Sequence, residues 1–338
     1  MPRFRSRQNG MGIGEACSIA SALAWSGGVI IYKRLGETLA PLQLNLLKNL
    51  IVLALIVPTL ALMPGFAWPS LPLTTLVLTL ISGVLGIAVA DTLYFRALNT
   101  HGAARMGIIG NLYSPFVLVL SFAFLSERLT ALQGVGFVLV SAGVLLVSRQ
   151  RADILTTAQN TAHPCADFVR RCSNDLLPRR RPLRGPDSAG NPISPTQLRL
   201  GLMYGAGAVA LMAVAIVMVK RVLEGQPLLW IVALRLVGGV LGLMAIFAWR
   251  GEPLLPRAAP RVRWRALFLA AFLGQYVSMV LWLAGYKYTK ASIAAILNET
   301  SSIFIVLLAW LFLHEGMSIR KLVGVACTLS GVAFMLAT

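Results

Sequence analysis

The chain has 338 residues, of which 57% are apolar and only 12% are charged. A soluble domain carries about a quarter charged residues, so this composition excludes a disordered chain and argues against a soluble enzyme. Lys and Arg outnumber Asp and Glu by 30 to 12, but they fall almost entirely in loops, where basic residues orient membrane proteins. We therefore expect a multi-pass protein of the lipid bilayer, with no nucleic-acid partner.

Apolar stretches long enough to cross a hydrocarbon layer of about 30 Å as helix follow one another along the chain. A basic arm over residues 1–13 precedes them without a cleavage pattern, so we expect the first helix to be retained. The expected spans are, in order, 14–32, 41–63, 72–95, 103–125, 131–148, 199–219, 226–249, 264–286, 291–313 and 319–337. The predicted fold class is an all-α polytopic membrane protein with ten transmembrane helices.

Residues 149–198 differ in character from the rest of the chain. They are rich in Arg, with the run RRRPLRGP at 179–186, and they predict a basic disordered loop. Cys165 and Cys172 share this loop with His163, but a metal site would need a further ligand nearby. We therefore expect no cofactor and no metal.

The two halves of the chain repeat each other. A shift of 188 residues places residues 103–144 on 291–332 without a gap, with twelve identities, and a shift of 187 places Lys48 on Arg235. The expected domains are therefore a first repeat at 14–148 and a second at 199–338. Five helices per repeat is an odd number, so the second repeat enters the membrane from the opposite side, and such inverted repeats are typical of secondary transporters.

Four charged residues fall inside expected spans, where each costs about 2.5–3.5 kcal/mol if it faces lipid. Lys48 and Arg235 hold equivalent positions and are expected to line a shared cavity, although long side chains can also reach the interface. Asp91 lies near the end of its span and fits an interfacial or a functional carboxylate. The side chain of Glu299 is too short to reach water, so we expect it to bind a proton or a cationic substrate group, with Lys48 or Arg235 either as its electrostatic partner or as the anchor for a substrate carboxylate.

Small and polar residues share one helical face around Glu299, which favours either close helix packing or an aqueous cavity. On the ninth span these residues are Ala291, Ala295, Asn298, Glu299 and Ser302, and on the fourth span they are Ala103, Gly107, Gly110, Asn111 and Ser114. Aromatic residues could stack on a ligand or form interfacial belts. These are Trp25, Tyr94, Tyr113, Tyr276 and Trp282.

Two further repeated features have structural interpretations. Gly136 and Gly143 lie two helical turns apart, as do Gly324 and Gly331, and we expect them to allow close packing of the fifth and tenth helices. Glu127 precedes the fifth helix and is expected to act as a helix cap.

Sequence motifs of enzymes and of ATP-driven pumps do not occur. The chain contains no HExxH, no GxSxG and no P-loop, so we do not expect an enzyme, and any transport must use a gradient.

The chain resembles the drug/metabolite transporter superfamily, as a protein with two EamA domains. The resemblance rests on Trp25, Lys33, Lys48, Arg235, the stretch 94–98, and the run from Asn111 through Pro115 to Glu127, Gly136 and 143–144. It implies that four helices of each repeat surround a central cavity, with the fifth and tenth outside. In the ninth helix Ile303 replaces the matching proline, so the sequence does not support a kink there.

The resemblance implies export of small metabolites or drugs across a bacterial inner membrane, with both termini in the cytoplasm. The excess of Lys and Arg on the other side points the opposite way. The sequence therefore predicts a secondary transporter of a small-molecule substrate, as a monomer or a homodimer. A channel, or a membrane enzyme or scaffold that does not transport, is the alternative.

Overall fold

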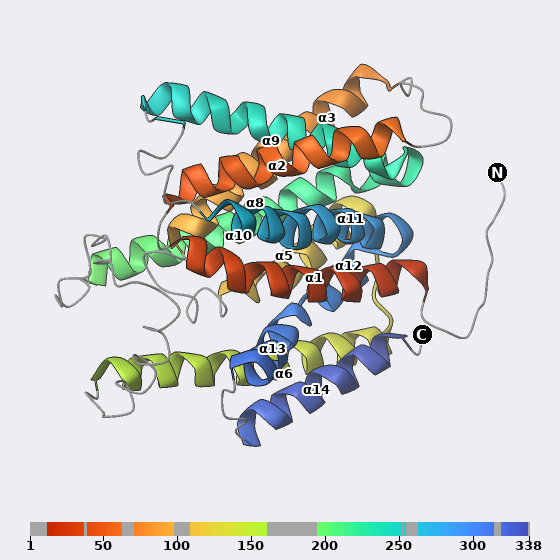
Figure 1. The fold of residues 1–338 in the computed structure, drawn as a ribbon. Coiled ribbons are helices and arrows are strands. Elements are labelled where there is room, and N and C mark those ends of the chain that lie inside the picture. Colours follow the sequence, from red (N-terminus) through yellow and green to blue (C-terminus); the bar gives the residue numbers. More distant parts are fainter. Residues whose placement is uncertain are drawn as a thin grey trace.

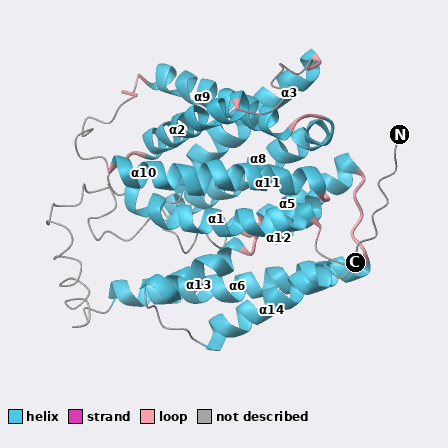
Figure 2. Cartoon of the chain, turned by 45° about the vertical axis from the view of Figure 1, so that its right-hand side comes forward, coloured by secondary structure: helices cyan, strands magenta, loops and turns pink. Residues whose placement is uncertain are grey.

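The structure is a computed structural model that describes residues 12–36, 39–62, 71–97, 109–160, 195–251, 253–254, 263–313 and 319–336. Throughout these ranges the regular structure is helical, as the sequence predicts (Figures 1 and 2). The basic arm, apart from residues 12 and 13, lies outside the described residues. So do Cys165 and Cys172.

The described part of the first half of the chain forms seven labelled elements. They are α1 (Ile13–Leu35), α2 (Pro41–Ala61), α3 (Leu73–Gly83), the π-helix η1 (Val84–Ala90), α5 (Tyr113–Leu120), the π-helix η2 (Ser121–Leu125) and α6 (Ala131–Asn160). Helix continues from η1 to Ala97, so that α3 and η1 belong to one stretch of 25 residues.

The second half repeats this order. Its elements are α8 (Pro195–Gly225), α9 (Leu228–Arg250), α10 (Trp264–Ala271), the π-helix η4 (Phe272–Val277), α11 (Ser278–Tyr288), α12 (Ala291–Asn298), α13 (Ser301–Leu313) and α14 (Ile319–Leu336). Helices α6 and α8 extend into the segment 149–198, where we expected a disordered loop. A helix satisfies its backbone hydrogen bonds internally, so it can continue beyond the apolar stretch that starts it.

Among the described residues, five helical stretches are long and apolar enough to cross a membrane. They cover Pro41–Ala61, Leu73–Ala97, Met203–Gly225, Leu228–Arg250 and Trp264–Tyr288, and four shorter apolar helices accompany them. Large apolar side chains face outward, including Val57, Leu241 and Phe268, while Lys48 and Arg235 are buried. An apolar exterior around a polar interior is the arrangement that suits hydrocarbon rather than water.

The chain direction reverses between the halves. In Figure 1, α1 begins and α14 ends on the right-hand side of the bundle, whereas α6 ends and α8 begins on the left. Helix α8 therefore runs opposite to α1, its counterpart in the first half.

Helices α6 and α14 lie side by side at one edge of the bundle, as the resemblance implies for the fifth and tenth helices (Figures 1 and 2). Their closest approach is at the repeated glycines: a Cβ atom on Gly136 would lie 2.8 Å from the carbonyl oxygen of Gly331, and one on Gly143 would lie against the carbonyl of Gly324. In the 188-residue shift, Gly136 corresponds to Gly324 and Gly143 to Gly331. The contacts are thus exchanged between equivalent residues, as a two-fold axis requires.

We predict that Gly136→Ala destabilises this helix pair, because the added methyl group would press on the backbone of α14. Overpacking of this kind costs about 1–3 kcal/mol. The measurement is the melting temperature of the purified protein in one detergent. Gly134→Ala is the matched control, since a Cβ atom on Gly134 of the same helix meets nothing within 4 Å; equal effects of the two substitutions would contradict the prediction.

Candidate functional site

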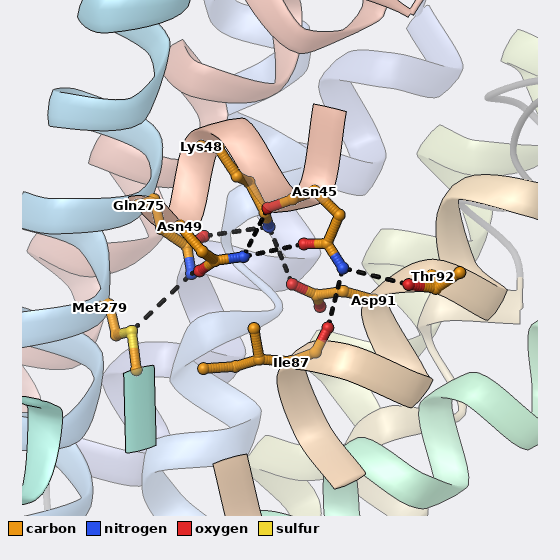
Figure 3. A network of polar contacts seen from close by, with 8 residues as sticks. All are labelled: Asn45, Lys48, Asn49, Ile87, Asp91, Thr92, Gln275 and Met279. Carbon is orange, nitrogen blue, oxygen red and sulfur yellow. Dashed lines mark hydrogen bonds and ion pairs between the residues drawn. The ribbon is translucent and has the colours of Figure 1, made fainter. Parts of the chain in front are cut away.

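Lys48, near the middle of α2, lies at the centre of a buried polar network (Figure 3). Its Nζ donates to Oδ2 of Asp91 at 2.8 Å and to Oε1 of Gln275 at 3.3 Å. The ammonium group also lies 4.9 Å from the ring centroid of Phe95 and 5.8 Å from that of Tyr32. A buried cation is tolerated only when it is paired, and here a carboxylate, an amide and two rings surround it.

Amide side chains extend the network on both sides of Lys48. Asn49 donates to Oδ1 of Asn45 at 2.9 Å, and Gln275 donates to Oδ1 of Asn49 at 3.4 Å. Asn45 in turn donates to the carbonyl oxygen of Ile87 at 2.8 Å. Lys48 and the two asparagines lie on α2, whereas Gln275 comes from the second half of the chain, so this network joins the two repeats.

Two π-helical segments position the partners of Lys48. Segment η1 ends directly before Asp91, and η4 contains Gln275. The 188-residue shift superposes them, so both repeats have the same distortion at the same place. A π-helical turn changes the hydrogen-bond pattern locally and is frequent at functional sites; here the Ile87 carbonyl of η1 accepts a side-chain amide.

Arg235 is the counterpart of Lys48, but the groups that it contacts directly are neutral. Its guanidinium donates to the hydroxyl of Ser82 and, at 3.4 Å, to the carbonyl of Ala215, and it lies 5.7 Å from the ring centroid of Trp282. Within the described residues its Nε has no hydrogen-bond partner. Lys48 thus has a carboxylate partner, and in the described part of the chain Arg235 has none.

Glu299 lies where the ninth span is interrupted. Helix α12 ends at Asn298 and α13 begins at Ser301; between them the amides of Glu299 and Thr300 donate to carbonyls three residues back, at 3.1 and 3.2 Å. The sequence did not support a kink here because Pro115 has no counterpart. The interruption forms without a proline, so the five-residue stripe that we expected on one continuous helix is divided between two.

The fourth span has the same interruption. Asn111 and Leu112 form a turn before α5, and the amide of Leu112 donates to the carbonyl of Ile109 at 3.0 Å. Asn111 corresponds to Glu299 in the 188-residue shift. Each residue has one buried side-chain atom, Nδ2 of Asn111 and Oε2 of Glu299, without a partner among the described residues.

The other carboxylate oxygen of Glu299, Oε1, accepts a hydrogen bond from the hydroxyl of Ser114 on α5. Ser114 Oγ also lies 3.3 Å from the carbonyl of Ala295. We expected Lys48 or Arg235 to pair with Glu299. In the described residues that pairing is absent, because Lys48 is paired with Asp91 and Arg235 faces Ser82 and Trp282.

Of the remaining expected aromatic residues, Trp25 and Tyr94 pack against other aromatic rings, whereas Tyr276 forms a hydrogen bond. Trp25 packs 6.4 Å from Tyr32 beside the Lys48 network, and Tyr94 packs 6.0 Å from Phe95. Tyr276, in contrast, bonds to Thr59 at 2.7 Å.

Two residues beside Glu299 have less to offer a ligand. Asn298 donates to the Ala294 carbonyl of its own helix at 2.8 Å. Ser302 follows in the first turn of α13 and is partly buried. Of these three neighbours in the described part of the chain, Glu299 alone combines a charge with an unpartnered buried atom.

Glu127 caps a helix, but not the one that we expected. Its carboxylate accepts from the amides of Ala291 and Ser292 at 2.9 and 3.0 Å and from the Ser292 hydroxyl at 2.6 Å. It therefore caps α12 of the second repeat rather than α6. The sequence places Glu127 directly before α6, whereas the fold brings the start of α12 within its reach.

Several residues that form these polar and aromatic contacts were missed from the sequence. Gln275 is a polar residue inside the apolar stretch 264–286. A single amide in such a stretch could have indicated a buried polar contact. Tyr286 donates or accepts at 2.7 Å with Tyr113, and Trp282 packs against it at 5.2 Å. Nothing in its own sequence surroundings distinguishes Tyr286.

The comparisons agree with this architecture. The family model described as the EamA-like transporter family matches residues 12–149 and 199–337. A solved structure, titled only as the crystal structure of a protein, shares 16% identity with a TM-score of 0.66, covering 95% of each chain. That likeness shows a common fold. No curated protein gives a match.

The family model thus covers both halves of the chain, and the helices have the apolar length of membrane spans. The chain belongs to the EamA-like transporter family, within the drug/metabolite transporter superfamily, as a multi-pass membrane protein with two EamA domains.

Proposed function

We propose that the chain is a gradient-driven carrier that exports a small metabolite or drug by alternating access. In this proposal ten helices span the membrane as two inverted repeats, 14–148 and 199–338, around a cavity halfway through the bilayer. The substrate-binding groups are those of the predicted site: Trp25, Lys48, Asp91, Tyr94, Asn111, Ser114, Arg235, Tyr276, Asn298, Glu299 and Ser302.

The observation that carries the proposal is the paired interruption at Asn111 and Glu299. Carriers with inverted repeats form their sites from discontinuous helices at the repeat interface. Here each repeat supplies one interrupted helix, and each interruption has a buried polar atom available to a ligand. The Ser114–Glu299 bond brings the two helices together, since Ser114 lies on α5 and Glu299 between α12 and α13.

Lys48 and Arg235 have different roles in this mechanism. Lys48 and Asp91 compensate each other and position α2 against η1. Arg235 has an unpartnered Nε and an aromatic neighbour, so it is the cation available to an acidic group of a solute. Because the chain has no P-loop, the free energy for transport comes from a gradient.

A carrier differs from a channel in showing counterflow. We expect proteoliposomes loaded with unlabelled solute to accumulate the labelled solute transiently, because each turnover returns a loaded site. The solute is first found by screening metabolites for an increase in melting temperature, since a ligand of the native state stabilises it. Saturable uptake with counterflow supports the carrier, whereas uptake linear in concentration and without counterflow indicates a channel.

The Lys48–Asp91 pair predicts a non-additive mutant cycle. Asp91→Asn leaves a buried cation without its counter-charge, which costs about 3–5 kcal/mol. The double variant Lys48→Met, Asp91→Asn removes both charges and should recover most of the lost stability. Melting temperatures of the two single variants and the double variant measure this coupling, and additive losses would show that the pair is not a unit.

We also propose that the protein lies in the inner membrane of a bacterial cell with both termini in the cytoplasm. Figure 1 places the start of α1 and the end of α14 on one side. A reporter enzyme that is active only in the periplasm, fused after Thr338, is expected to be inactive. An active fusion would reverse the orientation and support the distribution of Lys and Arg.

A further inference from the structure

Charged side chains connect the two repeats at the end of the bundle where α1 begins (Figure 1). Glu127, which lies just after η2 in the first repeat, accepts from the amides of Ala291 and Ser292 in the second, at 2.9 and 3.0 Å. These amides belong to the first turn of α12, and a carboxylate is stabilised at a helix N-terminus by the partial positive charge there. The first repeat therefore holds the start of α12 through a full charge.

Neighbouring contacts cross the same boundary between the repeats. The hydroxyl of Thr289 donates to Oε1 of Glu15 in α1 at 2.7 Å, and Lys290 donates to the carbonyl of Arg128 at 3.2 Å. The backbones are also close, because a Cβ atom on Gly14 would lie 2.8 Å from the Cβ atom of Thr289. A solute can pass between the repeats at this end only after these contacts have separated.

The backbone directly before Glu127 has an unfavourable conformation. Ser126 has a φ of 56° and a ψ of 26°, in the left-handed region that residues other than glycine and asparagine rarely adopt. Such a conformation persists where the surrounding structure determines it, and it is frequent in switch regions. The turn at Ser126 brings the next residue, Glu127, to the start of α12.

The sequence does not supply the same set of contacts to the opposite end of the bundle. In the 188-residue shift Gly102 corresponds to Lys290, and in the 187-residue shift Leu202 corresponds to Glu15. The ammonium group and the carboxylate that cross the boundary here thus have no charged equivalent, although the cap of α12 has one in Glu315. Contacts present at one end and missing at the other shift a two-state equilibrium towards closure of the first end.

We propose that Glu127 and the start of α12, with the contacts of Glu15 and Lys290, form a gate that is closed when no solute is bound. Glu127 is a positioning residue: it holds α12 and thereby determines how often the repeats separate at this end. In the proposed orientation the gate faces the cytoplasm. This inference rests on the proposed function, because a gate of this kind has a role only in a carrier that opens to both sides.

The first test measures opening of the gate in the purified full-length protein without any solute. The four cysteines are replaced by serine, and Ala295→Cys places one thiol on α12, at a buried position one helical turn inside the capped end. The rate of its reaction with N-ethylmaleimide is followed by intact mass. We expect slow labelling, and labelling about five- to tenfold faster after Glu127→Ala, the factor that corresponds to loss of a typical helix cap.

Thr130→Ala is the matched control. The Thr130 hydroxyl caps α6 at the same end by accepting from the amide of Gln133 at 3.3 Å, but this contact lies within the first repeat. The control should leave the labelling rate unchanged.

A second thiol position distinguishes opening of the gate from general loosening of the bundle. Ala213→Cys, in the same background without Ala295→Cys, places the thiol at a buried position of α8, and its labelling should stay slow after Glu127→Ala. Three results would each overturn the inference: equal rates for Glu127→Ala and Thr130→Ala, equal acceleration at both thiol positions, or labelling of Ala295→Cys that is already as fast as in denaturant.

The second test closes the gate covalently and does not depend on how Glu127→Ala folds. Glu15→Cys and Thr289→Cys, in the same background, replace two side chains whose oxygens lie 2.7 Å apart, and a short bis-methanethiosulfonate reagent joins the thiols reversibly. In proteoliposomes the cross-linked protein should lose counterflow of the solute found by the melting-temperature screen, and dithiothreitol should restore it. Thr289→Cys alone, treated in the same way, should keep counterflow.

The two tests separate this inference from the carrier function. Counterflow that survives the cross-link would show that this end stays closed during transport, so that the gate is refuted and the carrier function stands. If no variant shows counterflow but Glu127→Ala accelerates labelling as expected, the opening controlled by Glu127 stands and the carrier function fails.

Discussion

Hydrocarbon cannot solvate a charge, and this constraint governs where a charged side chain can lie within a membrane-spanning bundle. Large apolar residues cover the outside, and Lys48 and Arg235 are turned inward. Each buried charge then needs compensation from the protein or from a ligand. The Lys48–Asp91 pair meets that need internally, whereas Arg235 and Glu299 meet it only in part. The distribution of compensated and uncompensated charges separates the groups that hold the helices together from those that can take part in binding.

The two repeats share a backbone plan but differ in their chemistry. Both have a π-helical segment at the same position, both have an interrupted fourth helix, and α6 and α14 exchange equivalent glycine contacts. The side chains at equivalent positions differ, however: in the 188-residue shift Asp91 corresponds to Met279, and Asn111 corresponds to Glu299. The unequal side chains give the interior one ion pair, Lys48–Asp91, and one carboxylate, Glu299, that has no charged partner among the described residues.

Much of the fold could be predicted, because the thickness of the bilayer sets the length of the apolar stretches and because the internal repeat relates the two halves of the chain. Several helices start within two residues of the predicted spans, namely α1, α2, α3, α6, α9, α10, α12 and α14. Gly136 and Gly143 mark the contact between α6 and α14. The interruption at Glu299 was missed because the sequence argument depended on a proline, whereas here the backbone turns at Glu299 and Thr300 without one. The partner of Glu127 was missed for a different reason: its contact with Ala291 joins residues far apart in sequence, and no local pattern reports such a contact. The pairing of Lys48 with Asp91 likewise depends on how α2 crosses η1, which periodicity does not specify.

The side chain of Gln275 is the point at which the second repeat joins the Lys48 network. Its bonds to Lys48 and Asn49 are 3.3 and 3.4 Å long, whereas Lys48 holds Asp91 of its own repeat at 2.8 Å. An amide bond of this kind contributes only about 0.5–1.5 kcal/mol, much less than a buried ion pair loses when it is broken. Within this network the contact between the repeats is therefore weaker than the ion pair inside the first repeat. Loss of the Gln275 contacts would leave the Lys48–Asp91 pair intact.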